Sequence, residues 1–287
     1  MPHGHSEPRI DAAVAAYARG SVRWDIARVQ RWALALLFAA LVIASWQLAG
    51  VDLARLATGL PKLGHWLAQA WPPTLNELPI FLLRTGETVA IAFLGTLLAV
   101  LAAVPAAFLA ARGISPLGSA RVPLRWVLNA FRGVDSFVFA LILVAAVGLG
   151  PFAGLLGVAL HTWGSAAKLF SEQIETMPLE TTEALEAGGA GRVVAFRYAL
   201  LPELLPAWAS QALYLFEFNV RASTVLGVVG AGGIGQELKA SMDLLDFARL
   251  GTIIAVILVA VTLIDTLSGW IRKRLSLAQR PFFRRTG

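Results

Sequence analysis

Long apolar runs alternate with polar, arginine-containing segments along this chain of 287 residues. Backbone N–H and C=O groups in lipid must pair within their own segment, so a run of about 20 apolar residues predicts a membrane-spanning helix. The pattern therefore predicts an all-α membrane protein with six transmembrane helices. The six runs cover residues 32–48, 88–111, 126–147, 152–170, 204–229 and 247–270.

The polar segments divide the chain into a tail, a membrane domain and a second tail. Residues 1–31 form a polar, basic tail, and the apolar run starts too late for a signal peptide. Residues 32–270 make up the predicted six-helix transmembrane domain, and residues 271–287 form a basic tail. Within the domain, residues 49–86 are mixed in character and predict a loop with a surface helix.

The composition agrees with a membrane protein. The chain is 57% hydrophobic and 15% charged, with a mean hydropathy of +0.69. Soluble domains are about 45–50% apolar and about 25% charged. The chain has no cysteine, which excludes disulfides and thiolate metal sites. Its net charge of +6 could suggest nucleic acid, but the placement of the charges indicates membrane topology instead.

Basic residues are unequally divided between the two sides of the predicted membrane domain. The two tails and the loops after the second and fourth spans hold 17 of the 24 Lys and Arg residues, counting Lys168 with the loop that follows it, and the opposite side holds five, counting Arg249 at the start of the sixth span. Positive charge concentrates in cytoplasmic loops. Both termini and the loop at 171–203 are therefore predicted to be cytoplasmic, and the loop at 49–86 external.

For the cytoplasmic loop at 171–203 the sequence predicts a helix, a glycine joint and a second helix. Pro178 and Glu180 suit the first turn of a helix, because proline needs no N–H partner there and a carboxylate favours the positive end of the helix dipole. Gly188 and Gly189 supply a residue with positive φ, at which helices commonly end. A second helix then runs from Arg192 towards Pro202.

This loop resembles the coupling loop in the membrane subunits of ATP-binding-cassette importers. The family pattern is Glu-Ala-Ala, three residues, Gly, nine residues, Ile, one residue, Leu-Pro. Five positions match it at the right spacing: Glu183, Ala184, Gly189, Leu201 and Pro202. Leu185 and Ala199 depart from it. The resemblance implies a type I importer permease fold, and an ATPase-coupling site formed by Glu183, Ala184, Ala187, Gly189 and Pro202.

Charged residues within the predicted spans are candidates for a translocation path. A charge at mid-bilayer costs about 2.5–3.5 kcal/mol on insertion scales. Asp135 follows Arg132 by three residues, and Arg221 follows Glu217 by four, so each pair can share a helix face. The pairs are either structural ion pairs or a polar lining in which an arginine attracts an anion.

His161 carries the same two alternatives, structure or path. Ser223 and Thr224 follow Arg221 and complete the candidate translocation path.

The run Gly230-Ala231-Gly232-Gly233-Ile234-Gly235 fits the dinucleotide-binding pattern G-x-G-x-x-G. That pattern requires a preceding strand and a βαβ unit, whereas this run follows a membrane helix. Gly230, Gly232, Gly233 and Gly235 instead permit a sharp break, a close helix approach, or backbone N–H groups that cradle an anion. The sequence contains no Walker A motif, which assigns ATP hydrolysis to a separate subunit.

Two longer stretches are similar to the phosphonate-transporter branch of these permeases. They are residues 216–238, which include the glycine run, and residues 145–154. The stretch from Arg132 to Phe137 departs from that branch, which has Ile-Pro-Glu-Leu after the arginine. The resemblance implies a permease subunit for phosphonate or phosphite, with hypophosphite, phosphate or another small solute as alternatives.

The resemblance also implies partners and a location. Two ATPase subunits would carry ATP and Mg, a binding protein would deliver substrate, and a second permease chain, as a homodimer or a related subunit, would complete the path. The chain itself would bind no metal or cofactor, catalyse no reaction, contact no nucleic acid, and lie among lipids of a bacterial inner membrane. A channel or an ion-coupled transporter is the alternative class. An intramembrane hydrolase is disfavoured, since neither an H-E-x-x-H motif nor Ser/His/Asp spacing is present.

Overall fold

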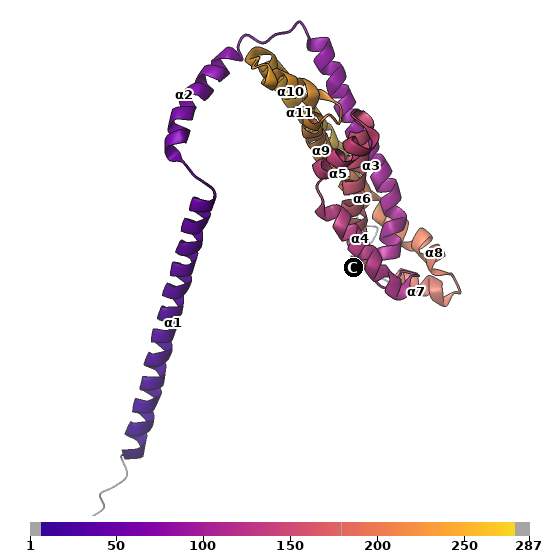
Figure 1. Cartoon of the computed structure of the whole chain (residues 1–287). Coiled ribbons are helices and arrows are strands. Elements are labelled where there is room, and N and C mark those ends of the chain that lie inside the picture. Colours follow the sequence, from indigo (N-terminus) through magenta and orange to yellow (C-terminus); the bar gives the residue numbers. More distant parts are fainter. Residues whose placement is uncertain (1–6, 179, 279–287) are drawn as a thin grey trace, which may run out of the picture. The chain divides into compact units, whose positions relative to one another are not determined.

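The computed structural model describes residues 7–178 and 180–278, and every regular element in these ranges is a helix (Figure 1). Positions 279–287, which include three arginines of the predicted basic tail, lie outside the described residues. The chain forms two compact units, Met1–Gly64 and His65–Gly287. The principal helices are α1 (Glu7–Leu48), α2 (Leu53–Gln69), α3 (Leu78–Ala110), α4 (Arg121–Gly133), α5 (Ser136–Val147), α6 (Pro151–Thr176), α7 (Glu180–Ala187), α8 (Arg192–Ala195), α9 (Leu201–Leu226), α10 (Ile234–Asp243) and α11 (Phe247–Ala278).

The first unit contains α1 and most of α2. The predicted tail at 1–31 is helical from Glu7 onwards and continues into the first predicted span without a break. The part of α1 from Arg28 to Leu48 is long and apolar enough to cross a membrane, and none of it is buried by protein. Asp52 accepts hydrogen bonds from the N–H groups of Ala54 and Arg55, at 2.9 and 3.0 Å, and so caps the start of α2.

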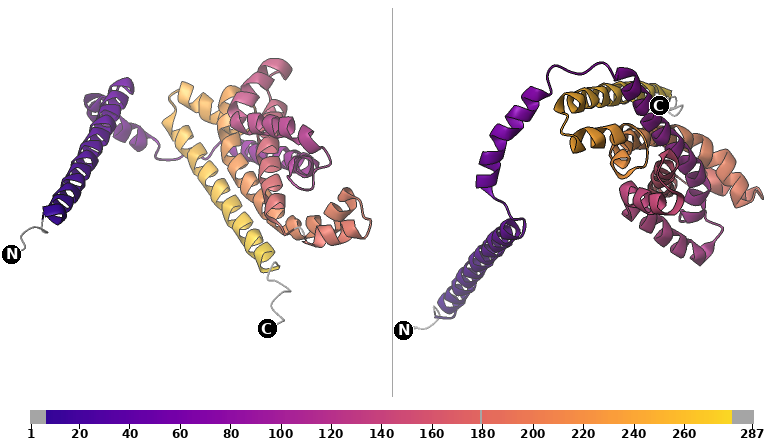
Figure 2. Two further views of the ribbon diagram at one scale, coloured as in Figure 1. Left: turned by 90° about the horizontal axis from the view of Figure 1, so that it is seen from below. Right: turned by 45° about the horizontal axis from the view of Figure 1, so that its top comes forward.

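The second unit is a helical bundle centred on α6. This helix contacts α3, α4, α5 and α9, while α11 runs alongside α9 and α10 (Figure 2). Small residues allow the close approach: a Cβ on Gly164 would lie 2.6 Å from the backbone nitrogen of Arg132. Such small contact residues are typical of helix packing in membranes, where close backbone approach drives association.

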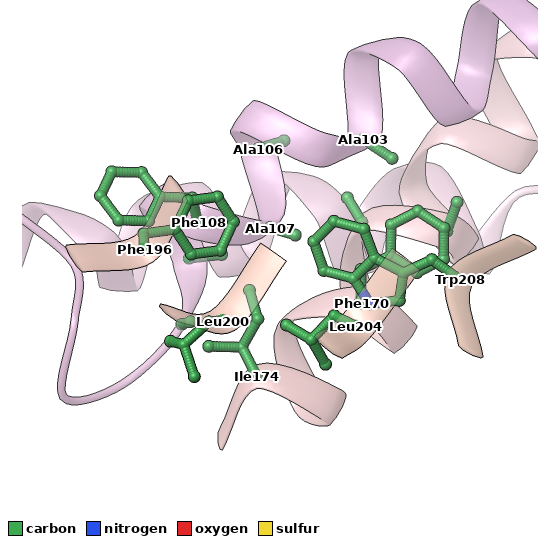
Figure 3. Close-up of a cluster of buried hydrophobic side chains, with 14 of the residues drawn as sticks. Ala103, Ala106, Ala107, Phe108, Phe170, Ile174, Phe196, Leu200, Leu204 and Trp208 are labelled. Carbon is green, nitrogen blue, oxygen red and sulfur yellow. The ribbon is translucent and has the colours of Figure 1, made fainter. Parts of the chain in front are cut away.

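The largest hydrophobic cluster lies where α3, α6 and α9 meet the segment that precedes α9. Phe170 stacks on Trp208 with ring centroids 4.5 Å apart, and Phe108 contacts Phe196 at 4.7 Å (Figure 3). Leu200, which is also buried here, belongs with Phe196 to the segment between α8 and α9. The segment predicted to couple to an ATPase is therefore rooted in the main core of the bundle.

The third predicted span is not one helix. Residues 126–147 fall into α4 and α5, which are bent by 89° about a break at Val134 and Asp135. The carboxylate of Asp135 accepts a hydrogen bond from the N–H of Phe137 at 2.8 Å and starts the new helix. An N-capping carboxylate favours such a start, and so the prediction of a continuous span was wrong.

Four helical segments in the described residues are long and apolar enough to cross a membrane, or five if the bent pair is one span. Besides the part of α1 already described, these segments are α3, α9 with its flanking turns, and α11, which correspond to the second, fifth and sixth predicted spans. The fourth predicted span lies in α6, which is not among these segments and is surrounded in large part by neighbouring helices. Six crossings with both termini cytoplasmic remain a prediction.

Candidate functional site

The predicted helix, glycine joint and second helix are all present in the coupling segment, which we define as residues 180–195. α7 ends at Ala187, and Gly189 has φ +90°. The N–H of Gly189 donates to the carbonyl of Glu186 at 2.9 Å, and that of Ala190 to Leu185 at 3.0 Å. These bonds satisfy carbonyl groups that would otherwise be free at the helix end, which is typical of a helix that ends at a glycine.

Four of the predicted coupling residues lie on the surface of this segment: Glu183, Ala184, Ala187 and Gly189. Pro202, the fifth, is exposed in the first turn of α9. It also borders a hollow of about 620 Å³ between the end of α6 and the start of α9. All five predicted coupling residues are thus exposed in the described part of the chain, and their contact with an ATPase stays a prediction.

The chain returns from the coupling segment into the bundle through a π-helical turn, Phe196–Leu200. This turn contains Ala199, one of the two departures from the family pattern. Single π turns inside helices are often found at functional sites. Phe196 and Leu200 are both buried in the main core, so a displacement of the coupling segment would also displace side chains that pack against α3, α6 and α9.

Polar contacts also hold the coupling segment and its neighbours. Arg192 donates to the carbonyl of Ser115 at 3.2 Å. Glu175, near the end of α6, accepts from the N–H of Arg112 at 2.9 Å and pairs with Arg125. These contacts join the loop after α3 to α4, to the end of α6 and to the coupling segment.

The two predicted ion pairs within the spans are absent from the described residues. Arg132 is exposed and forms no ion pair with Asp135, whose carboxylate caps α5 instead. Glu217 is 5% exposed and pairs with Arg272, whose Nη2 lies 2.8 Å from Oε1 and 3.2 Å from Oε2. Sequence spacing suggested partners on the same helix, but Glu217 finds its partner 55 residues away on α11.

Arg221 turns towards α11 as well. Its Nη2 lies 3.8 Å from Oδ1 of Asp265, and its Nε–H donates to the backbone carbonyl of Glu217, not to the carboxylate. The side chain of Arg221 is 54% exposed, and at that exposure a surface pair contributes little stability. Arg221 is therefore a cation held in position but still accessible.

A hollow of about 570 Å³ between α5 and α9 brings two of the candidate path residues together. Asp135 and Arg221 both line it, with Ser136 at the start of α5 and the aromatic side chains of Phe137, Tyr214 and Phe218. Arg132, Glu217 and His161 do not line it. Of the two arginines that the sequence offered for the path, Arg221 lines this hollow and Arg132 does not.

His161 supports the broken span from the neighbouring helix. Its Nδ1 lies 2.8 Å from the carbonyl oxygen of Val134, the last residue before the cap of α5. The tautomer with a proton on Nδ1 donates this bond and satisfies a carbonyl that the break leaves without a helical partner. Of the two alternatives for His161, the structure supports the structural one.

Ser223 and Thr224 do not line the hollow between α5 and α9 either. Ser223 is fully buried, and the hydroxyl of Thr224 donates to the carbonyl of Val220 at 3.2 Å. Sequence reasoning missed their neighbour Asn219, which is fully buried and donates to the hydroxyls of Thr96 at 2.7 Å and Thr162 at 2.9 Å. These bonds join α9 to α3 and α6. The sequence did contain a signal for Asn219, because a polar amide stands there in an apolar run, one helical turn before Ser223.

The glycine-rich break is a close-packed corner. Gly230, Gly232 and Gly233 have φ between +77° and +86°, and a Cβ on Gly233 would lie 2.3 Å from Oγ1 of Thr88. The N–H of Ile234 donates to that same hydroxyl at 2.8 Å. Gly232, Gly233 and Gly235 are buried, so this corner shows the sharp break and the close approach, and its buried glycines offer no open anion cradle.

A second group of charges, not predicted, surrounds Arg249 at the start of α11. Its guanidinium lies 2.8 Å from Glu77 and 2.6 Å from Glu237, and Glu237 lies 3.5 Å from Arg84. The cluster ties the N-terminal end of α3 to α10 and α11. Within the described residues, no three His, Cys, Asp or Glu side chains are grouped so as to hold a metal ion.

Comparison with known proteins agrees with these features. Residues 103–279 match the family described as binding-protein-dependent transport system inner membrane component. The chain is 42% identical to "Putative phosphite transport system permease protein HtxC" of Stutzerimonas stutzeri, over 92% of this chain and 94% of that protein. It is 38% identical to "Phosphite transport system permease protein PtxC" of the same species, over 84% and 87%.

A solved structure shares the fold. The chain superposes on one from the inward-facing MetNI methionine ABC transporter with a TM-score of 0.60 and 20% identity. The match covers 70% of this chain and 99% of the other. At that identity the comparison speaks for the fold alone.

Proposed function

The chain belongs to the binding-protein-dependent transport system inner membrane component family, and we propose that it imports a small phosphorus oxyanion, phosphonate or phosphite. It is the permease subunit of an ATP-binding-cassette importer and resides in the inner membrane. The observation that carries the mechanism is that the exposed coupling segment continues into two residues buried in the hydrophobic core, Phe196 and Leu200.

Coupling follows from this arrangement. A separate ATPase, carrying ATP and Mg, would contact α7 around Glu183, Ala184, Ala187 and Gly189. The chain has no Walker A motif of its own. When the ATPase subunits close, the coupling segment would move with them, and the buried side chains of Phe196 and Leu200 would pass the motion to α3, α6 and α9. The path would then open alternately to either side of the membrane.

The substrate proposal rests on two observations of different kind. The hollow between α5 and α9 presents the accessible guanidinium of Arg221, a group suited to the oxygens of a phosphorus oxyanion. The relatives HtxC and PtxC are named for phosphite transport. Phosphonate, hypophosphite and phosphate share the same anionic oxygens, and so the binding protein would make most of the distinction among them.

The proposed assembly contains two permease chains, two ATPase subunits and a substrate-binding protein. The second permease chain would be a further copy or a related subunit. Six crossings would place both termini and the coupling segment in the cytoplasm, as the distribution of Lys and Arg predicts. The bent pair α4–α5 would count as one crossing.

The test is uptake by proteoliposomes that contain the permease, its co-purified ATPase and the binding protein. We expect ATP, supplied on the side of the membrane that carries the ATPase subunits, to drive accumulation of labelled phosphite or a phosphonate. A nonhydrolysable nucleotide should drive no accumulation. Competition by phosphite, methylphosphonate, hypophosphite and phosphate would rank the substrates. Uptake driven by an ion gradient without ATP would contradict the proposal and support the ion-coupled class.

A further inference from the structure

α2 carries two opposite stripes of residues. Leucines recur at intervals of three and four residues, and polar residues recur at the same intervals two positions later. The apolar stripe comprises Leu53, Leu56, Leu60, Leu63 and Leu67, and the polar stripe comprises Arg55, Thr58, Lys62, His65 and Gln69. At 100° per residue these stripes lie on opposite sides of the helix, which makes α2 strongly amphipathic.

Protein does not cover the leucine stripe in the structure. The five leucines are between 49% and 66% exposed, and α2 contains no buried residue. A contiguous apolar face of this kind marks a surface that meets a protein or a membrane. The folded chain therefore leaves the partner of this face to be identified.

Both ends of α2 are tied to the ends of membrane helices. It begins five residues after Leu48, where the first membrane-crossing helix stops. At its other end the ring of Trp66 stacks on that of Phe247, the first residue of α11, with centroids 5.4 Å apart. A Cβ on Gly251 would lie 3.0 Å from that of Ala70, so the chain just beyond α2 also packs closely on α11.

We infer that α2 lies in the plane of the membrane interface, with its leucine stripe buried among phospholipid acyl chains and its polar stripe in water. Both of its ends are held at the depth where membrane helices begin or stop. Its length of 17 residues, about 25 Å, suits a helix that lies along the surface. Leucines on one side with Arg55 and Lys62 on the other are typical of interfacial helices.

Pairing with α2 of a second copy fits these observations less well. Leucines at three- and four-residue spacing are the pattern of a coiled coil, but a coiled coil needs the repeat over at least about three heptads. Here the stripe covers only residues 53–67, and Pro61 lies inside the helix beside Leu60, where it removes a backbone hydrogen bond. Lipid requires no matching helix and tolerates such a short stripe.

The absence of cysteine from the chain allows a clean test. Single-cysteine variants at Leu56, Leu60 and Leu63, with matched controls at Thr58 and Lys62, would carry a nitroxide label in the complete transporter. The host would be proteoliposomes of phosphatidylethanolamine and phosphatidylglycerol. The accessibility of each label to oxygen, which concentrates in the bilayer, and to a water-soluble nickel chelate would then be measured.

We expect the leucine-stripe labels to meet oxygen several-fold more readily than the nickel chelate, and the Thr58 and Lys62 labels to show the reverse. Equal access of the nickel chelate to both stripes would overturn the inference. So would spin–spin broadening at Leu60 with low access to both reagents, which would indicate a second copy or another protein on the stripe. Because all five sites are exposed, the variants should assemble normally, and size-exclusion chromatography would verify this.

Discussion

At the scale of single residues, Glu217 and Arg272 form an ion pair between α9 and α11 in which the carboxylate is buried. Glu217 is 5% exposed, so Arg272→Ala would leave a buried carboxylate without its cation. Breaking a buried pair from one side typically costs 3–5 kcal/mol, and the partial exposure of Arg272 places our expectation at about 3 kcal/mol. Thermal unfolding of the purified subunit would measure the loss.

A double variant separates loss of the pair from loss of the arginine side chain. Glu217→Gln with Arg272→Met removes both charges and should recover most of the stability. Arg221→Ala is the control, because it leaves the Glu217 carboxylate paired. If Arg221→Ala destabilised the subunit more than Arg272→Ala, the assigned partner of Glu217 would be wrong.

Arg221 should matter for transport more than for folding. Its guanidinium is half exposed and lines the hollow with Asp135, whereas Arg132 lies outside that hollow. A charged hydrogen bond contributes about 1.5–3 kcal/mol, so Arg221→Gln should lower ATP-driven uptake by roughly tenfold or more. Arg132→Gln is the matched control and should transport normally. Equal uptake by the two variants, per assembled complex, would remove Arg221 from the path.

At the scale of elements, the joint between α7 and α8 offers a test of coupling. Gly189 has φ +90° and open space around it, so Gly189→Ala acts through backbone strain of about 1–3 kcal/mol. Uptake should fall while membrane insertion stays intact. Gly191→Ala is the control, because Gly191 has φ −70° and equally open surroundings. Normal uptake and ATPase association in Gly189→Ala would argue against the coupling role.

The glycine-rich corner should instead fail by overpacking. A Cβ on Gly235 would lie 2.0 Å from the carbonyl oxygen of Thr224, and neither atom belongs to a flexible side chain. Overpacking of this kind costs about 1–3 kcal/mol or more, so Gly235→Ala should reduce the yield of folded subunit. Gly86→Ala, on an exposed face of α3, should gain up to about 1 kcal/mol. Similar melting temperatures for the two variants would contradict the close packing.

The elements that sequence predicted well are those whose causes are local. Gly189 follows the end of α7 because of its own backbone freedom, whereas Pro178 lies before α7 and not in its first turn as predicted. The break at Asp135 was also local, since the carboxylate caps α5, but the surrounding apolar run concealed it. The partners of Glu217 and Asn219 could not be read from spacing, because they lie on other helices and depend on how α3, α6, α9 and α11 pack.

At the scale of the whole molecule, the bundle should fold without the first helix. The buried hydrophobic clusters are formed by residues from Phe81 onwards, and none of the described residues from 28 to 64 is buried. Deletion of residues 1–48 should therefore shift the melting temperature of the purified subunit by only a few degrees, the change expected for about 1 kcal/mol in a domain of this size. A loss of cooperative unfolding would show that α1 contributes to the core after all.

If α4 and α5 together make one crossing, as we propose, the elbow between them sets a limit on bilayer thickness. The two arms have 13 and 12 residues, or about 20 and 18 Å, and at 89° their ends are about 27 Å apart. A typical hydrocarbon core is about 30 Å thick, and α3, with 33 residues, exceeds it easily. The bent pair therefore falls slightly short where its neighbour has length to spare. Hydrophobic mismatch would develop at the elbow first, and lengthening the lipid acyl chains should slow transport before it disturbs the rest of the bundle.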